Sequence, residues 1–176
     1  IGANTIHIMA LPIYNIGLGI NPALIGLAIS VPRLWDGLID PPMGYWSDNI
    51  RTRFGRRKPF LVIGIILAAL CYALLWSPPQ QAGKTTIFLY FFAFSLIFYT
   101  ALTIYLVPYY ALANELTSDY YLRAKLMSYS VMFISVAGVF TPWGYRLSFC
   151  PYFGTNEIEG VRVIGIIGGS LMIITG

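Results

Sequence analysis

Charged residues are scarce in this sequence. Of its 176 residues, 7 are Asp or Glu and 11 are Lys or Arg, so 10% are charged, whereas 57% are hydrophobic. A soluble domain of this length could not cover its surface with so few charges. The composition therefore excludes an ordinary soluble protein and favours one that lies in a lipid bilayer.

Reactive side chains are also few. The sequence has one histidine, His7, and two cysteines, Cys71 and Cys150, whose spacing matches no zinc or redox motif. It contains neither HExxH nor GxSxG, which disfavours a membrane-embedded hydrolase. We therefore expect no enzyme activity, no cofactor and no metal centre.

Long stretches without any charge are what the sequence does have. No Asp, Glu, Lys or Arg occurs in 1–32, 60–76, 85–114 or 126–145. Since about 20 residues of helix cross the hydrocarbon core, these runs are long enough to span it. Asn, Pro, Gly and charge clusters divide them into six predicted helices, near 1–19, 23–47, 59–77, 86–113, 126–147 and 161–176. Both ends of the chain fall in apolar runs, so we expect the first and sixth helices to be truncated.

The cations predict the orientation of these helices. Five lie in residues 51–58, and Arg123 and Lys125 lie in a second short connection. The positive-inside rule places the loops 51–58 and 115–125 in the cytoplasm and the connections 78–84 and 151–160 outside, in a plasma or inner membrane. Because the cations cluster beside spans, the net charge of +4 indicates topology and a lipid bilayer as partner, not nucleic acid.

Three ionisable residues lie well inside the second predicted helix: Arg33, Asp36 and Asp40. A charge at the centre of a membrane helix costs about 2.5–3.5 kcal/mol on insertion scales, so it remains only where protein or water receives it. Asp36 and Asp40 are one turn apart on one face, and Arg33 can reach that face. Two carboxylates in a medium of low dielectric resist simultaneous ionisation, so the pair should bind a cation or hold a proton.

The alternative is a structural ion pair between Arg33 and Asp36, which would leave Asp40 unexplained; we favour a site for a coupling cation. Pro41 and Pro42 follow, and either free backbone carbonyls near Asp40 or only bend the helix.

Polar residues in two other helices could join this site. Thr103 could offer its hydroxyl to a cation, although a membrane threonine more often bonds its own preceding carbonyl. Tyr99 lies near it in the same helix. Asn4 and His7 are polar within the first helix, where each faces a substrate cavity or bonds a neighbouring helix.

A long motif starts at these charges. It reads Arg33-x-Trp-Asp36-x-x-x-Asp40-Pro-x-x-Gly44-x-x-x-Asp48-x-x-Arg51-Thr-Arg53-x-Gly55-Arg56-Arg57, and Ala113-x-Glu115-Leu-Thr-x-Asp119 with Arg123 follows the fourth helix. The sequence resembles the glycoside-pentoside-hexuronide:cation symporters of the major facilitator superfamily over nearly its whole length.

This resemblance implies an all-α membrane protein: the N-terminal six-helix bundle of a twelve-helix fold, with the C-terminal bundle absent from this chain and the substrate site between the two bundles. It assigns cation binding to Asp36, Asp40 and Thr103. The stretch from Gly44 onward matches the superfamily signature between helices 2 and 3, which implies a conformational latch formed by Gly44, Asp48, Arg51, Arg53, Arg56, Arg57, Glu115 and Arg123. Physically, Gly44 would permit close helix approach, and Asp48 at a helix C-terminus needs a partner. The alternative for the cations of 51–58 is that they only fix topology and bind anionic lipid.

The sequence also departs from this family. The acid that holds sugar in its melibiose-transporting members falls on Leu106, the arginine of helix 5 on Val131, and a Tyr-Thr-Asp motif appears as Tyr14-Asn15-Ile16. These changes disfavour a galactoside. Ile39 replaces a polar amide found in sodium-using relatives, which favours a proton as coupling ion over the alternative, sodium.

The resulting functional hypothesis is symport of a sugar, glycoside or related small solute with a cation, by alternating access. A lysolipid or other amphiphile transporter is the second hypothesis, because some animal relatives share the helix 2 motif. A non-transporting membrane sensor on the same fold is the third.

Overall fold

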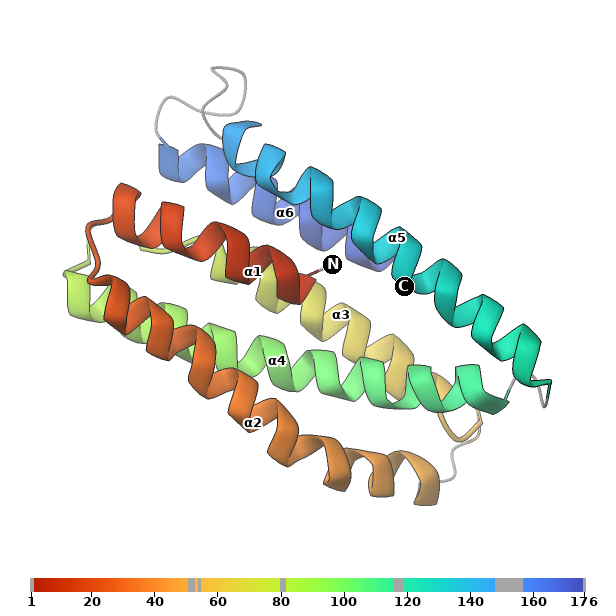
Figure 1. Cartoon of the computed structure of the whole chain (residues 1–176). Helices are drawn as coiled ribbons and strands as arrows, with labels where there is room; N and C mark the ends of the chain where they lie inside the picture. The colour runs from red at the N-terminus through yellow and green to blue at the C-terminus, as the bar shows by residue number, and fades with distance from the viewer. Residues whose placement is uncertain are drawn as a thin grey trace.

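The computed structural model describes residues 2–50, 53, 55–79, 82–115, 119–147 and 157–175. Within these residues the chain forms helices and no β-sheet (Figure 1). The elements are α1 (Gly2–Ala10), the π-helix η1 (Leu11–Gly17), α2 (Pro22–Asn49), α3 (Lys58–Leu75), α4 (Lys84–Glu115), α5 (Tyr120–Leu147) and α6 (Glu157–Thr175). The all-helical class predicted from the sequence is confirmed.

The helices run side by side as one bundle. In the view of Figure 1, α1, α2, α4 and α5 lie toward the viewer, and α3 and α6 lie behind them. The most extensive packing joins α3 to α4, α2 to α4 and α3 to α6. Helix α4 thus packs against α2 on one side and against α3 on another.

The first predicted helix, 1–19, is not uniform. It is α-helical to Ala10 and continues as the π-helix Leu11–Gly17. Pro12 cannot donate a backbone hydrogen bond, which favours a wider local turn. Gly19, with φ +64°, reverses the chain, and Asn15 Nδ2 donates to the Ile20 carbonyl at 2.7 Å.

Helix α2 begins sharply and is long. Asn21 caps it by accepting from the Ala23 amide at 2.9 Å, and Pro22 occupies the first turn. Pro41 and Pro42 lie inside the helix without ending it, and Figure 1 shows α2 curving along its length. The predicted bend at the prolines agrees with this curvature.

An aromatic core holds η1, α3 and α4 together. The Tyr14 hydroxyl donates to the Leu75 carbonyl at 2.5 Å, and the Tyr14 and Phe91 rings lie 4.2 Å apart. Both side chains are almost fully buried, as is Trp76. These contacts fix η1 against α3 and α4, and they leave α1 beside α2 for polar contacts.

Close backbone approach occurs at a glycine that the sequence did not single out. A Cβ on Gly64 of α3 would lie 2.7 Å from the Tyr105 amide nitrogen of α4. The predicted close approach at Gly44 is different, because a Cβ there would lie 3.8 Å from a Val107 methyl, an ordinary contact. Gly64, not Gly44, therefore permits the close approach of α3 and α4, and Gly169 of α6 similarly lies against the backbone of α3, where a Cβ would lie 2.8 Å from the Ala69 carbonyl oxygen.

Candidate functional site

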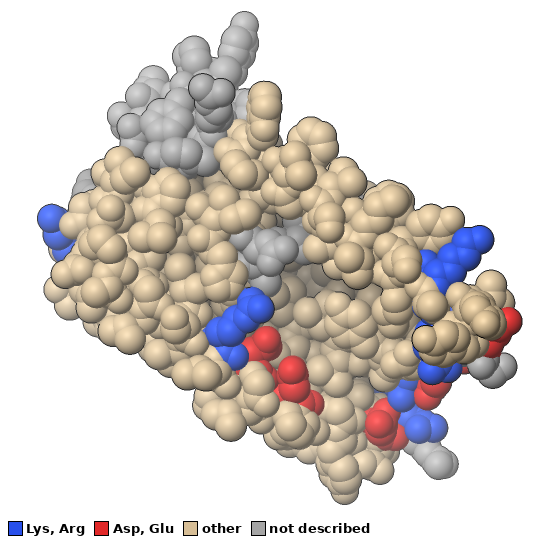
Figure 2. Space-filling view, viewed as in Figure 1, with Lys and Arg blue, Asp and Glu red and all other residues tan. Residues whose placement is uncertain are grey.

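The two carboxylates of α2 lie part-way along the helix, away from its charged end. Asp36 and Asp40 are one turn apart. Figure 2 shows acidic and basic side chains together in the middle of this face, beside a hollow and separate from the charged cluster at one end of the molecule. Asp36 is partly buried and Asp40 is exposed. Asp40 is therefore not enclosed by the helices of this bundle.

Thr103 of α4 completes this cluster. Its side chain is 1% exposed, and its hydroxyl donates to Asp36 Oδ1. The same hydroxyl oxygen lies 3.2 Å from the Tyr99 carbonyl. A hydroxyl has one hydrogen, so the bond across to α2 competes with the local bond within α4. Asp40 lies close enough to Asp36 for the two carboxylates to repel each other, and close enough to Thr103 for a side-chain hydrogen bond. Three side chains from two helices thus converge on one position.

Arg33 makes a different contact from the one predicted. Among the described residues, it forms no ion pair with Asp36 or Asp40. Its Nη1 lies 3.1 Å from His7 Nε2 on α1, and Nε2 also lies 3.3 Å from the Tyr99 hydroxyl. The guanidinium extends toward α1, and the hydroxyl of Thr103 bonds Asp36 instead. Arg33, which was predicted to pair with the carboxylates, therefore contacts His7.

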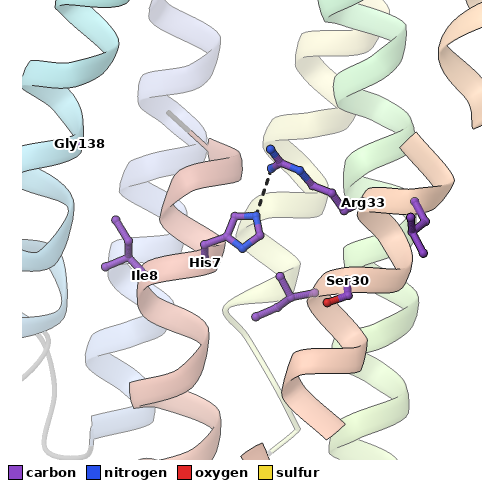
Figure 3. A pocket seen from close by; sticks show the side chains of 7 residues that line it. His7, Ile8, Ser30, Arg33 and Gly138 are labelled. Atoms are coloured by element: carbon purple, nitrogen blue, oxygen red, sulfur yellow. Dashed lines mark hydrogen bonds between the residues drawn. The ribbon is translucent and has the colours of Figure 1, made fainter. Parts of the chain in front are cut away.

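A pocket of about 750 Å³ opens between α1, α2 and α5 at this contact (Figure 3). Its lining combines the polar groups of His7, Ser30 and Arg33 with an apolar wall of Ile8, Ile29 and Leu34, and Gly138 closes the third side. His7 and Tyr99, both predicted for a substrate cavity, belong to this network; the side chain of Asn4 lies outside the described residues. The volume is that of a small-molecule site.

Sequence reasoning missed one link between α2 and α4. The indole Nε1 of Trp35 donates to Thr100 Oγ1 at 3.2 Å, and the Thr100 hydroxyl lies 2.9 Å from the Leu96 carbonyl. This bond sits one residue before Asp36 and holds α2 against α4. The tryptophan belonged to the motif, but nothing in the sequence pointed to its partner.

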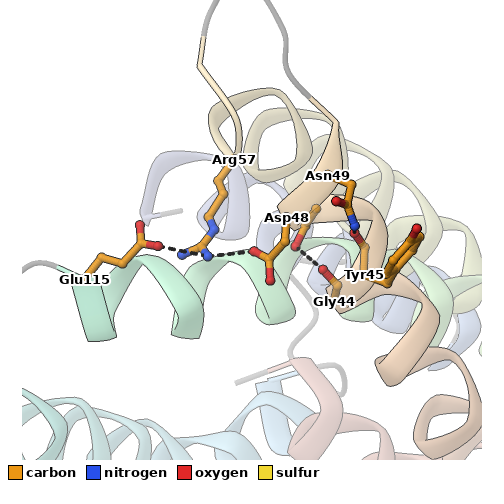
Figure 4. Close-up of polar contacts among 7 residues, drawn as sticks. Gly44, Tyr45, Asp48, Asn49, Arg57 and Glu115 are labelled. Atoms are coloured by element: carbon orange, nitrogen blue, oxygen red, sulfur yellow. Dashed lines mark hydrogen bonds and ion pairs between the residues drawn. The ribbon is translucent and has the colours of Figure 1, made fainter.

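An ion-pair relay lies at one end of the bundle (Figure 4). Arg57 Nη2 contacts Asp48 Oδ1 of α2 at 2.7 Å and Glu115 Oε1 of α4 at 3.1 Å. The Arg57 side chain is 11% exposed, whereas the two acids are 53% and 61% exposed. A largely buried guanidinium between two acids connects the ends of α2 and α4, and it supplies the partner that Asp48 at a helix C-terminus needs.

The other predicted latch residues lie around this relay. Arg123 Nη2 donates to the Asn114 carbonyl at 3.1 Å, next to Glu115. Within the described part of the chain Arg53 and Arg56 join no ion pair, and Arg51 lies outside it.

In the part of the chain that the structure describes, four helices have the length and composition of membrane spans: Pro22–Asn49, Lys58–Leu75, Lys84–Glu115 and Tyr120–Trp143. Two membrane-embedded carboxylates and a threonine meet between two of these spans beside a hollow. The fold and the site together define an integral membrane protein with a polar centre between two of its spans.

Comparison with known proteins identifies the family. The family described as MFS/sugar transport protein matches residues 1–175, so the chain belongs to it. An uncharacterized symporter of Synechocystis sp. is 34% identical over 68% of this chain, and a sodium-dependent lysophosphatidylcholine symporter of Danio rerio is 34% identical over 62%. A putative glycoside/cation symporter of Escherichia coli is 28% identical over 90%.

The chain spans only part of these relatives, 23%, 20% and 35% of their lengths respectively. The predicted membership of the major facilitator symporters is confirmed by the family match, and the relatives are named as transporters.

Proposed function

We propose that this chain is part of a secondary active transporter that couples symport of a sugar, glycoside or related solute to a cation. The observation that carries the proposal is the convergence of Asp36, Asp40 and Thr103 between α2 and α4. Membrane-embedded carboxylates mark ion pathways in transporters, and here they border the hollow face of the bundle. In this family fold a second bundle faces the first across the substrate, and alternating access moves one bundle against the other.

The relay of Asp48, Arg57 and Glu115 fits such a cycle as the conformational latch. It joins the ends of two helices that also hold the cation cluster, so a shift of α2 against α4 must stretch or break it. Both acids are more than half exposed, so water can solvate them when the ion pairs open, whereas the largely buried Arg57 side chain needs another partner. The latch and the cation cluster then join the same two moving helices, α2 and α4, at different positions along their length.

Carriage of a lysolipid is the second candidate. It is favoured by the Danio rerio relative, whose name states a lysophosphatidylcholine substrate and sodium dependence. The apolar wall of the pocket, formed by Ile8, Ile29 and Leu34, is compatible with an acyl chain as well as with a sugar ring. Transport of defined probes separates the two candidates.

The coupling ion is proposed to be a proton, with sodium as the alternative. A proton needs one carboxylate, whereas sodium requires several oxygens at once, and Ile39 offers none. The full-length protein in vesicles should accumulate phenyl β-D-glucoside or phenyl β-D-glucuronide under an inward proton gradient without sodium. The matched measurement imposes an inward sodium gradient at equal pH. Accumulation driven only by sodium would overturn the proton assignment, and accumulation of lysophosphatidylcholine alone would overturn the glycoside class.

The orientation is tested by single cysteines, in a background with Cys71→Ala and Cys150→Ala. Gly83 and Tyr120 are exposed at the starts of α4 and α5, at opposite ends of the bundle. We expect Gly83→Cys to react with an impermeant maleimide on intact cells, and Tyr120→Cys only after permeabilisation. The reverse pattern would invert the proposed topology.

A further inference from the structure

Two neighbouring hydrogen bonds join α2 to α4 beside the carboxylates. Asp36 accepts from the Thr103 hydroxyl. The residue before it, Trp35, donates its indole N–H to Thr100 Oγ1 at 3.2 Å. The two threonines are three residues apart on α4, so they lie on one face of that helix. Trp35 therefore contacts α4 one turn away from the hydroxyl that meets the cation cluster.

The bond made by Thr103 depends on the state of the cation cluster. Its hydroxyl has one hydrogen and lies near three acceptors, which are Asp36, Asp40 and the Tyr99 carbonyl. A bound cation or proton requires the hydroxyl oxygen as a ligand or an acceptor, which frees the hydrogen to turn to the Tyr99 carbonyl. Because this bond changes when the cluster is occupied, it does not by itself fix the position of α4 against α2.

The bond between Trp35 and Thr100 has no such competition. An indole N–H only donates, and it does not titrate. The Thr100 hydroxyl donates its hydrogen to the Leu96 carbonyl at 2.9 Å and accepts from Trp35 with a lone pair, so both bonds form at once. Neither partner is charged, and this bond is therefore the same whether or not a cation is bound.

The burial of the two side chains shows which of them can adjust. Thr103 is 1% exposed, and a β-branched side chain has little freedom at χ1. The place of its hydroxyl is therefore set by where the backbone of α4 lies against α2. Trp35 is 41% exposed, so much of its ring lies outside the core. Its buried contribution is small for a tryptophan, and its directed contact with α4 is the hydrogen bond to Thr100.

We infer that Trp35 is a positioning residue for the cation site: its bond to Thr100 holds α4 where the Thr103 hydroxyl reaches Asp36. The inference rests on the proposed coupling function and adds a residue that acts through α4, not as a ligand. Loss of the indole N–H lets α4 move against α2, and the Thr103 hydroxyl then turns from Asp36 to the Tyr99 carbonyl, its local acceptor.

The test follows the infrared stretching bands of the Asp36 carboxyl group in the purified full-length protein, at constant pH and without sodium. Subtracting the spectrum of Asp36→Asn assigns the bands, and Thr103→Val marks their position without the hydroxyl. We expect Trp35→Phe, which keeps an aromatic ring but has no N–H, to move the bands toward the Thr103→Val position. Thr100→Val removes the acceptor and should do the same. Unchanged bands in both variants would overturn the inference.

Equilibrium ion binding measures the consequence for the site. Radioactive sodium is the probe for sodium, and a pH titration of the same Asp36 bands is the probe for a proton. We expect Trp35→Phe to shift the half-saturation point of the ion that the unmodified protein binds by about 3- to 10-fold, the scale of one neutral hydrogen bond. The double variant with Thr100→Val should shift it no further, because both changes remove the same bond. Additive shifts would contradict the inference.

Controls separate positioning from folding and from transport. Trp46→Phe removes an indole N–H from the same helix at a 58% exposed position and should leave the Asp36 bands unchanged. Thr100→Ser keeps the acceptor hydroxyl and should behave as the unmodified protein. A lower melting temperature of Trp35→Phe with unchanged Asp36 bands would show that the bond only joins two helices, and would overturn the inference. Absence of gradient-driven uptake would refute the transport proposal and leave the spectral result standing.

Discussion

Asparagine at position 36 or 40 of the full-length protein is expected to abolish concentrative uptake, leaving internal solute no higher than external. The substitution removes a titratable oxygen and a negative charge but keeps nearly the same shape. The hydroxyl of Thr103 can still donate to the amide oxygen of Asp36→Asn, so the contact between α2 and α4 persists. Coupling, not folding, should be lost.

Solute exchange distinguishes loss of coupling from loss of the site. A neutral side chain imitates the protonated carboxylate, so Asp36→Asn in a proton-coupled protein should still exchange labelled for unlabelled solute across the vesicle. Asp36→Glu restores the charge and should recover part of the accumulation. Normal gradient-driven accumulation in both asparagine variants would remove these residues from the coupling mechanism.

Alanine at Gly64 is expected to destabilise the protein strongly. The added Cβ would lie 2.7 Å from the Tyr105 amide nitrogen and 2.9 Å from its Cα, both backbone atoms that cannot move aside as a flexible side chain would. Overpacking of this kind costs about 1–3 kcal/mol, and here α3 and α4 must separate. Because α3 and α4 share extensive packing, the whole bundle should loosen.

A matched glycine gives the opposite expectation. Gly26 lies in α2, and a Cβ there would meet nothing within 4 Å. Alanine at Gly26 should be neutral or stabilising, because it lowers the conformational freedom of the unfolded chain. The thermal stability of both variants is measured by heating the detergent-solubilised proteins. A thiol-reactive dye reports unfolding when it reaches Cys71, which is 5% exposed in the folded protein. Equal melting temperatures for the Gly64→Ala and unmodified proteins would show that the helices adjust without cost.

Part of the site could be expected from the sequence because both of its carboxylates lie on one helix. The four-residue spacing of Asp36 and Asp40 places them on one face whatever surrounds the helix. The prediction of Thr103 depended on the family resemblance, since nothing in the sequence of α4 indicates which helix its hydroxyl faces. The hydrogen bond between Trp35 and Thr100 was not predicted, because it depends on the relative rotation of two helices.

Other polar partners also depended on packing. Arg33 lies three residues before Asp36 and could have paired with it, but its side chain extends to His7, 26 positions away in the chain. Asp48 was expected to have a partner. Arg57 contacts both Asp48 and Glu115 because it lies at the start of α3, between the ends of α2 and α4.

The sequence by itself determined the class of protein, the helices and the membrane location of the carboxylates, because hydrophobic length and helical spacing act locally along the chain. Tertiary structure alone decided which polar groups meet across helices and which glycine lies at a close contact. Gly44 and Gly64 are both glycines in long apolar helices, and only the crossing of α3 over α4 sets a backbone against the second. Likewise, Arg33 is an ion-pair candidate in the sequence but contacts His7 in the fold, because the position of α1 brings the imidazole within hydrogen-bond distance of the guanidinium.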